Sequence, residues 1–279
     1  MKKSLRYSTL LTIIISYLIA PTTKTLATGY FLYNFNNPGT LSEAGSIKQS
    51  WSRFWWVNSG GYLKISGGRG STNIGALPAN DPWKILYSRN NPTDTDQGLY
   101  PQNIFRLVSQ DKWDNARQEA YFIVKNDNLS SSQNRNQSNG LLLFNRYQDG
   151  NNLYYTGIRV DGSAVIKKKQ NGIYYTMAEV KGVYPGNYDK TSSPNLLPKN
   201  KWIGLRSEVI NLNNGSVEIR VYVDKGWQGK WKLVANAIDD GKKYGGTAIT
   251  EPGYVGIRTD FMDVEFENFR ALDINKFTF

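Results

Sequence analysis

Any chemistry in this sequence must come from carboxylates, tyrosines, cations or hydroxyls, because its 279 residues include no His and no Cys. Without His there is no Ser-His-Asp triad, no Cys-His dyad and no imidazole ligand for a metal. Without Cys there are no disulfides, thiolate nucleophiles, iron–sulfur clusters or thiolate zinc sites. The sequence retains 18 Tyr, 23 acidic and 34 basic residues. Carboxylate and tyrosine chemistry of the kind used on glycans is therefore still available.

A tyrosine and an arginine share one face of a predicted strand at 153–160. Tyr155 and Arg159 are four residues apart, and side chains alternate between the two faces of a strand. A β-elimination on a uronate needs a cation for the carboxylate, a base for the C5 proton and an acid for the leaving oxygen. Arginine can neutralise the carboxylate, and tyrosine can transfer protons where a nearby cation lowers its pKa. We therefore predict Tyr155 and Arg159 as catalytic residues, with substrate contacts from Arg146, Lys167, Arg206 and Glu208.

The same side chains have a second interpretation. A strand face that carries both Arg and Glu is also typical of cross-strand ion pairs on a basic outer surface. Under this alternative Arg206 and Glu208 pair with neighbouring strands and form no part of a substrate site.

Four tryptophans in the N-terminal third are a further candidate for sugar contact: Trp51, Trp55, Trp56 and Trp83. Aromatic rings stack on the apolar faces of sugars, but a tryptophan in a β-sandwich also packs well in the core. Both interpretations stay open at this point.

No cofactor and no metal ligand set is predicted, although a structural Ca²⁺ remains an open alternative. Asp94 and Asp96, or Asp239 and Asp240, provide two carboxylates in one loop, whereas a calcium site needs several oxygen ligands.

The three lysines at 167–169 are too few to indicate nucleic-acid binding, and no recognition motif accompanies them. We expect no nucleic-acid partner.

The first 27 residues are typical of an export signal. Lys2, Lys3 and Arg6 precede an apolar stretch at 7–20, and Leu26 lies between the small residues Thr25 and Ala27. Fourteen mostly apolar residues are too few to span a bilayer. We expect cleavage after residue 27, no membrane anchor, and a monomeric secreted or periplasmic protein formed by a single domain at 28–279. Cleavage would remove four basic and no acidic residues, so the net charge would fall from +11 to +7.

Short alternating runs separated by turn residues dominate the rest of the chain. The dipeptides Asp149-Gly150, Asp161-Gly162, Asn171-Gly172 and Asn214-Gly215 are strong hairpin signals. No sustained helical periodicity is present, and the Asn-rich segment at 126–139 is predicted to be a mobile surface loop. About a dozen hairpin-linked strands without crossover helices indicate an all-β antiparallel sandwich of the jelly-roll type. The expected strands are 62–66, 104–108, 120–125, 140–147, 153–160, 164–169, 172–177, 202–210, 216–223, 231–236, 253–258 and 263–272.

The order of these elements resembles the concanavalin A-like lectin/glucanase superfamily. The residues that carry the resemblance are GLLLFNRYQDGNNLYY at 140–155, KKK at 167–169, KWIGLRSE at 201–208, YVD at 222–224, GYVGIR at 253–258 and VEFENFR at 264–270. The sequence is similar to the jelly rolls described as laminin-G-like, as 3-keto-glycoside hydrolases, or as glucuronan and alginate lyases. The match covers roughly half of the chain after residue 27, and most matched positions are packing and turn residues.

The resemblance implies a polysaccharide partner and two possible catalytic patterns. The glucanase branch uses Glu-x-Asp-x-(x)-Glu on one strand, and Asp263, Glu265 and Glu267 alternate in a similar way, although this strand commonly faces solvent. The alginate-lyase branch uses a Gln-x-His pair with Arg and Tyr, and this sequence has no His. That pattern is therefore broken, and a lyase here would need another base, for which tyrosine is the candidate. On this basis we expect a protein that acts on an acidic, uronate-containing glycan as a lyase. A glycoside hydrolase, and a non-catalytic carbohydrate-binding or adhesion domain that uses the same groove, remain alternatives.

Overall fold

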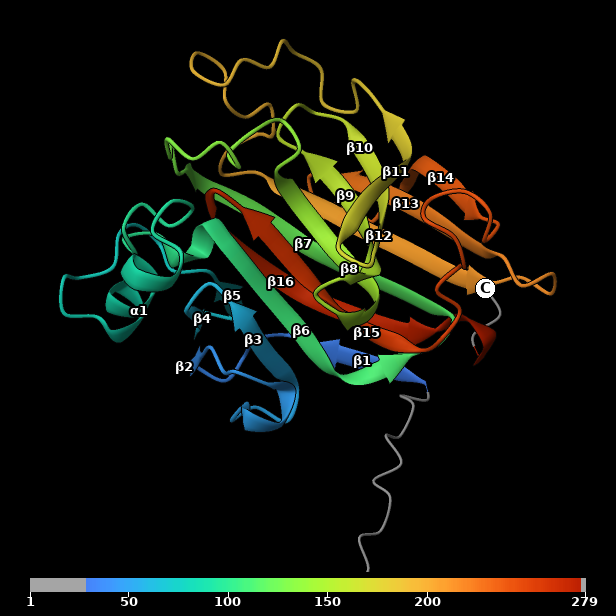
Figure 1. The fold of residues 1–279 in the computed structure, drawn as a ribbon, viewed down its shortest axis with the longest axis horizontal. Coiled ribbons are helices and arrows are strands. Elements are labelled where there is room, and N and C mark those ends of the chain that lie inside the picture. The colour runs from blue at the N-terminus through green and yellow to red at the C-terminus, as the bar shows by residue number, and fades with distance from the viewer. Residues whose placement is uncertain (1–28, 277–279) are drawn as a thin grey trace, which may run out of the picture.

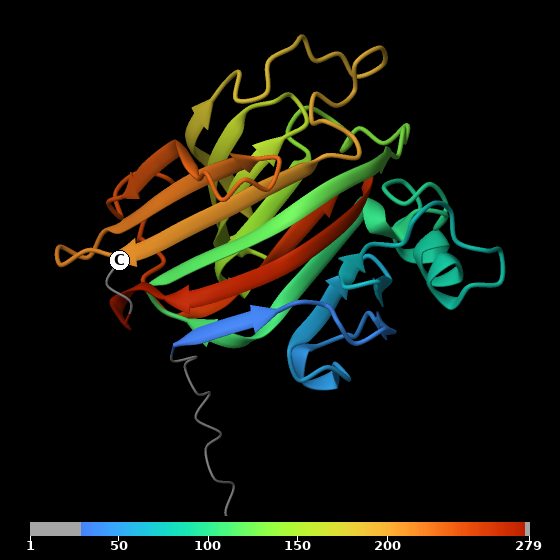
Figure 2. The ribbon, with the colours of Figure 1, turned by 180° about the vertical axis from the view of Figure 1, so that it is seen from behind.

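The computed structural model describes residues 29–276, and two antiparallel β-sheets packed face to face make up most of it (Figure 1). The predicted all-β antiparallel sandwich is therefore confirmed. The seven-stranded sheet lies toward the viewer in Figure 1, and the nine-stranded sheet lies toward the viewer in Figure 2. The predicted signal segment at 1–27 lies outside the described residues.

The seven-stranded sheet contains, in spatial order, β11 (Ile173–Val180), β10 (Ala164–Gln170), β9 (Asn152–Arg159), β8 (Gly140–Asp149), β15 (Gly253–Asp260), β6 (Ile104–Trp113) and β3 (Trp55–Ser59). The nine-stranded sheet contains β14 (Lys232–Asp239), β13 (Val217–Lys225), β12 (Trp202–Asn211), β7 (Ala116–Asp127), β16 (Met262–Asp273), β5 (Arg69–Ser71), β4 (Tyr62–Ser66) and β2 (Gly39–Ser42), and β1 (Tyr30–Tyr33) also pairs with β16. The last long strand of the chain, β16, therefore lies inside this sheet.

All twelve predicted strands are present, and four short strands in the N-terminal third, β1, β2, β3 and β5, were not predicted. The sequence also gave no periodic signal for α1 (Pro82–Asn90), which exposes most of its side chains. A local signal was present, because Asp81 caps the helix by accepting hydrogen bonds from two backbone N–H groups and Pro82 follows at the first turn. The other helical segments are the 3₁₀ turns η1 (Ile47–Gln49), η2 (Pro101–Asn103) and η3 (Ile274–Lys276).

The predicted hairpin dipeptides lie at strand connections. Asn171 and Gly172 join β10 to β11 and have φ values of 51° and 84°. Two consecutive positive φ angles are the requirement of the tight turn that Asn-Gly favours.

The core between the sheets follows the predicted alternation. Ile158 on β9, Leu205 on β12 and Ile219 on β13 are fully buried in one inter-sheet cluster. The strand at 164–169 had no clear face in the sequence, and the structure assigns Ile166 to this cluster and Val165 to the opposite face. A second, smaller apolar cluster therefore covers the outer face of the seven-stranded sheet.

One ion pair lies inside the sandwich and joins the two sheets. The ammonium of Lys168 on β10 is 2.8 Å from a carboxylate oxygen of Asp239 on β14, and both side chains are 0% exposed. The hydroxyl of Tyr154 donates to the same carboxylate at 2.6 Å. Lys168 also donates to the carbonyl oxygens of Gly246 and Thr247. This group of contacts holds the loop after β14 against both sheets.

Candidate functional site

A pocket of about 420 Å³ opens on the outer face of the seven-stranded sheet, and we call it the outer-face pocket. Strands β6, β15, β8, β9, β10 and β11 supply its base, and the Asn-rich loop between β7 and β8 supplies one side. Its lining includes Tyr155 and Lys167, two of the six predicted site residues.

The register of the strands orders the side chains of this face in two rows. In the first row Arg106 on β6 lies opposite Arg258 on β15, which lies opposite Leu142 on β8. The row continues through Gly157 on β9 to Val165 on β10. The second row contains Val108, Gly256, Phe144, Tyr155 and Lys167.

Two glycines, Gly157 and Gly256, lie where adjacent strands of this sheet approach each other closely. A Cβ atom at Gly157 would lie 2.2 Å from the carbonyl oxygen of Leu141, and a Cβ atom at Gly256 would lie 2.1 Å from that of Leu107. Neither position therefore accepts a side chain without a backbone shift. Between the cationic residues the base is formed by short apolar groups, Leu142 and Val165.

Arg258 is fixed at the centre of the pocket. Its Nε lies 2.7 Å from Asp260, its guanidinium carbon lies 4.9 Å from the ring centroid of Tyr155, and its Nη1 donates to the hydroxyl of Tyr174 at 3.4 Å. Burial lowers the pKa of Arg258, but Asp260 and the two tyrosines act more strongly and raise this pKa above its ordinary value. The guanidinium is therefore a permanent positive charge.

The two tyrosines beside Arg258 differ in their capacity to transfer a proton. Tyr155 is 2% exposed, and burial raises its pKa to about 12 although Arg258 and Arg106 act against the shift. Tyr174 is 46% exposed. Burial raises the pKa of Tyr174, but Arg258 and Lys169 outweigh this effect and the pKa lies below its ordinary value of 10.0. Of the two hydroxyl groups, that of Tyr174 is therefore the more accessible and the more readily deprotonated.

Two further cations of the pocket, Arg106 and Lys167, make no direct contact with a carboxylate, although Glu43 and Glu179 act on them over a longer distance. Within residues 29–276, no hydrogen bond or ion pair is formed by the side chain of Arg106 or of Lys167, and the buried Nε of Arg106 has no partner. Burial lowers the pKa of Lys167, and the charges of Arg159 and Arg258 lower it further. Buried polar atoms normally have a hydrogen-bond partner, and the Nε of Arg106 is an exception. The half-buried ammonium of Lys167 can accept an anion as its partner.

The predicted Arg159 lies on β9 beside the pocket, but its donors are already engaged. Its Nη1 lies 2.6 Å from Glu179, its Nη2 lies 2.5 Å from Asp161, and its Nε donates to the carbonyl oxygen of Gln137. An arginine in two ion pairs has little left to offer a substrate carboxylate. Its positive charge still affects the pocket, because it lowers the pKa of Lys167.

The other predicted contact residues lie elsewhere, so the six do not form one cradle. A bulge in β8 gives Arg146 a φ of 50°, and its buried guanidinium contacts Thr250 and Asn211 rather than the outer face.

Arg206 and Glu208 lie on β12 of the other sheet. Arg206 pairs with Glu119 at 2.6 Å, and Glu208 pairs with Arg117 at 2.6 Å. These are the cross-strand pairs of the alternative interpretation.

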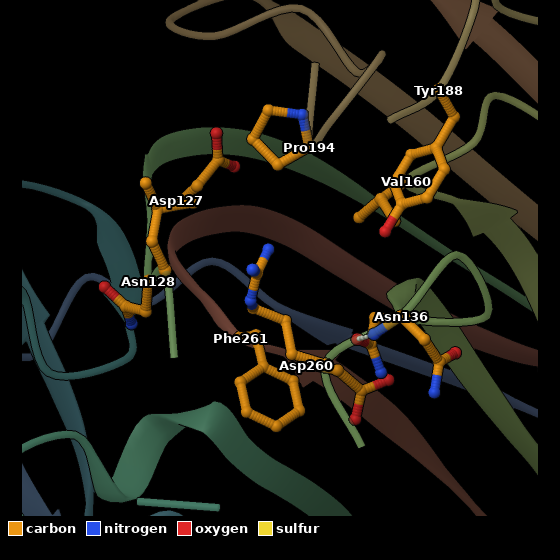
Figure 3. Close-up of a pocket in the computed structure, with 11 residues that line it drawn as sticks. Asp127, Asn128, Asn136, Val160, Tyr188, Pro194, Asp260 and Phe261 are labelled. Atoms are coloured by element: carbon orange, nitrogen blue, oxygen red, sulfur yellow. Dashed lines mark hydrogen bonds between the residues drawn. The ribbon is translucent and has the colours of Figure 1, made fainter. Parts of the chain in front are cut away.

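The Asn-rich loop at 126–139 is anchored, whereas the sequence suggested a mobile segment. Ser132 and Asn134 donate to the carboxylate of Asp94, and Ser130 donates to that of Asp96. A small cavity of about 10 Å³, enough for one water molecule, lies behind this loop (Figure 3). The cavity and the outer-face pocket share Asp260 and three other lining residues, Asn136, Asn139 and Phe261.

The carboxylates considered for calcium or for glucanase chemistry have other partners. Within the described part of the chain no group of three or more acidic side chains could hold a metal ion. Asp239 is paired with Lys168. On β16, Asp263 is buried and accepts hydrogen bonds from Gln102 and Asn128, while Glu265 pairs with Arg69.

The four N-terminal tryptophans do not form one platform. Trp55 is fully buried in the core, and Trp56 and Trp83 are half-buried with their indole N–H groups donated to Ala44 and Ser42. Trp51 is 95% exposed.

No family model and no curated protein matches the sequence. Among solved structures, the chain is similar to a carbohydrate-binding module CBM66 from Bacillus subtilis, with 14% identity and a TM-score of 0.47 over 78% of this chain and 95% of that one. It is also similar to a Bacillus licheniformis β-glucanase, with 12% identity and a TM-score of 0.44 over 88% and 98% of the two chains. A Bacillus subtilis protein of unknown function with a galectin-like fold gives 11% identity and a TM-score of 0.47 over 89% and 97%.

Identities and TM-scores this low leave the ligand of this chain to be argued from its own residues. No helix among residues 29–276 has the length and apolar character needed to cross a bilayer.

Proposed function

We propose that the outer-face pocket binds an acidic sugar unit of a polysaccharide. The observation that carries this proposal is the pair of unpartnered cations, Arg106 and Lys167, beside Arg258 in one pocket. A carboxylate would supply the acceptors that these donors lack, and hydrogen bonds to charged groups stabilise a complex by about 1.5–3 kcal/mol each.

The remaining lining suits a sugar ring better than a small inorganic anion. Leu142 and Val165 offer an apolar base, and amide side chains of the Asn-rich loop, including Asn134 and Asn136, lie at the side where hydroxyl groups would be. Pockets for small ligands typically combine an apolar lining with a few polar groups that fix orientation.

A second candidate function is β-elimination at the same site, and Tyr174 favours it. Its hydroxyl lies 3.4 Å from Arg258 Nη1, it is accessible, and its pKa is lowered. The phenolate would take the C5 proton, the electron pair would form the C4–C5 double bond, and the C4–O bond would break. The phenol would then return a proton to the leaving oxygen. Arg258 and Arg106 would hold the uronate carboxylate.

A panel of uronate and neutral polysaccharides tests both candidates. We expect alginate or polygalacturonate to bind, with affinity that falls as salt rises because exposed charges are screened over ~8 Å at physiological ionic strength. Turnover would add ultraviolet absorbance from the unsaturated uronate. Since the base is the phenolate, turnover should rise with pH through the lowered pKa of Tyr174.

The Tyr174→Phe variant separates the two candidates. It should abolish any rise in absorbance while binding remains within about threefold, because the hydroxyl contributes one neutral hydrogen bond. Binding without absorbance would leave a carbohydrate-binding module. Binding of neutral polymers alone would contradict the proposed acidic ligand.

We further propose that the protein acts outside the cytoplasm as one domain at 28–279 after removal of 1–27. The basic and apolar composition of the first 27 residues supports this proposal. N-terminal sequencing of the protein from the culture medium or periplasm should start at Thr28. Recovery of the Met1 form alone from these fractions would contradict it.

A further inference from the structure

A second cavity, of about 590 Å³, lies at the edge of the sandwich, and we call it the edge pocket. It lies where β11 and β14, the outermost strands of the two sheets, contact each other. The valines at 180, 183, 223 and 234, together with Leu233, give it an apolar lining.

Four lysines surround this apolar lining from two sides. Lys181 follows β11, whereas Lys225, Lys230 and Lys232 come from the β13–β14 hairpin. Lys225 is held in place, because its ammonium donates to the carbonyl oxygen of Val183 at 2.5 Å and lies 4.5 Å from the ring centroid of Tyr184.

The other three lysines carry unneutralised charge. Lys181, Lys230 and Lys232 make no side-chain hydrogen bond or ion pair within residues 29–276. Asp224 is the carboxylate that lines the pocket, and it is fully buried.

Asp224 forms no ion pair with these ammonium groups, because it is buried and already accepts three hydrogen bonds. Its oxygens accept hydrogen bonds from the hydroxyl of Tyr121 at 2.9 Å and from the backbone N–H groups of Gln228 and Gly229. The carboxylate therefore fixes the hairpin that carries the lysines, and the cavity keeps a net positive charge.

We propose that the edge pocket is a second binding site for an acidic polysaccharide and takes units further along the chain that occupies the outer-face pocket. The ligand class rests on the proposed function. Strand β11 links the two sites, because Tyr174 lines one and Val180 lines the other. Six residues at ~3.3 Å each separate them by about 20 Å, a distance that a polymer spans and a disaccharide does not.

A different role for lysines on edge strands is to prevent edge-to-edge pairing of sheets. That role needs neither a cavity nor a hairpin fixed by a buried carboxylate. It also predicts no change in glycan affinity when the lysines are replaced.

The test compares two triple variants of the full chain with equal change in charge. The first combines Lys181→Gln, Lys230→Gln and Lys232→Gln, and the control combines Lys48→Gln, Lys201→Gln and Lys242→Gln, which are exposed and outside both pockets. Calorimetric titration with polygalacturonate, alginate and the disaccharide of each measures the affinities.

We expect the first variant to bind polymer at least about tenfold more weakly. Two linked sites typically bind a polymer about 10²- to 10⁴-fold more tightly than either site alone. Its affinity for the disaccharide should not change, and the control should lose less than about twofold. Equal polymer affinity of the two triples would overturn the second site while leaving the first intact. A third outcome is also informative: the unaltered protein binds no disaccharide, and the Lys181/Lys230/Lys232 variant no longer binds polymer. This result would support the edge pocket and overturn the outer-face pocket.

Discussion

Replacement of Lys168 by methionine is expected to lower the free energy of unfolding by about 3–5 kcal/mol. The substitution leaves the carboxylate of Asp239 buried without its counter-ion, and it removes the donor for two backbone carbonyl groups, those of Gly246 and Thr247. Tyr154 and the backbone N–H of Gly241 still donate to Asp239, but two neutral hydrogen bonds do not compensate a buried charge.

Urea unfolding of Lys168→Met and Lys169→Met checks this prediction. Lys169 is the next residue on β10 and faces the other way, with its ammonium on the carbonyl oxygen of Gly150 and 4.8 Å from the ring centroid of Tyr174. The control should lose less than about 1 kcal/mol, as is usual for partly exposed charges. Equal losses in the two variants would show that the ion pair contributes nothing particular to stability.

The second large effect is expected on binding. Arg106→Met should weaken the binding of a uronate disaccharide by about 10- to 100-fold, because one charged hydrogen-bonding group is removed and each 1.4 kcal/mol is a factor of ten. Stability should not fall with it. The Nε of Arg106 is buried without a partner, so its removal eliminates an unsatisfied donor and leaves no carboxylate unpaired.

The matched control is Arg89→Met, at an exposed position on α1. It should leave both disaccharide affinity and the unfolding midpoint unchanged. A large loss of stability in Arg106→Met would mean that this arginine is structural, and unchanged affinity would remove it from the site. Residues that bind a ligand often lower the stability of the ligand-free protein, and we expect Arg106 to be one of them.

The strands were predicted well where they are long and where apolar and polar residues alternate along them. Segments such as 216–223 show their core face directly, because Val217, Ile219, Val221 and Val223 recur with the period of a strand. The missed strands β1, β2, β3 and β5 have three to five residues, too few for a period to appear. Strands β1, β2 and β3 also pair with strands that are remote in the chain, so the local pattern carries little information on them.

The residues that line the outer-face pocket could be predicted from the sequence only in part. Alternation separated Tyr155 from the core residues of its strand, and Lys167 was expected on a neighbouring strand; the structure pairs the two directly. Alternation gave no indication that β15 would bring Arg258 beside Tyr155, because that neighbour is set by sheet order. Arg146 was misplaced because a bulge changes the alternation after Asn145.

The position of β16 has a consequence for how this chain acquires its structure. The strand is among the last residues of the chain, yet it pairs with β7, with β5 and with β1, the first described strand. During synthesis or passage through a pore, from the N-terminus onward, none of these three ladders can form until residues 262–273 have emerged. Contacts of such long sequence separation also form slowly. The nine-stranded sheet is therefore completed only after β16 has been synthesised, and β1, β5 and one edge of β7 have no partner on that side until then.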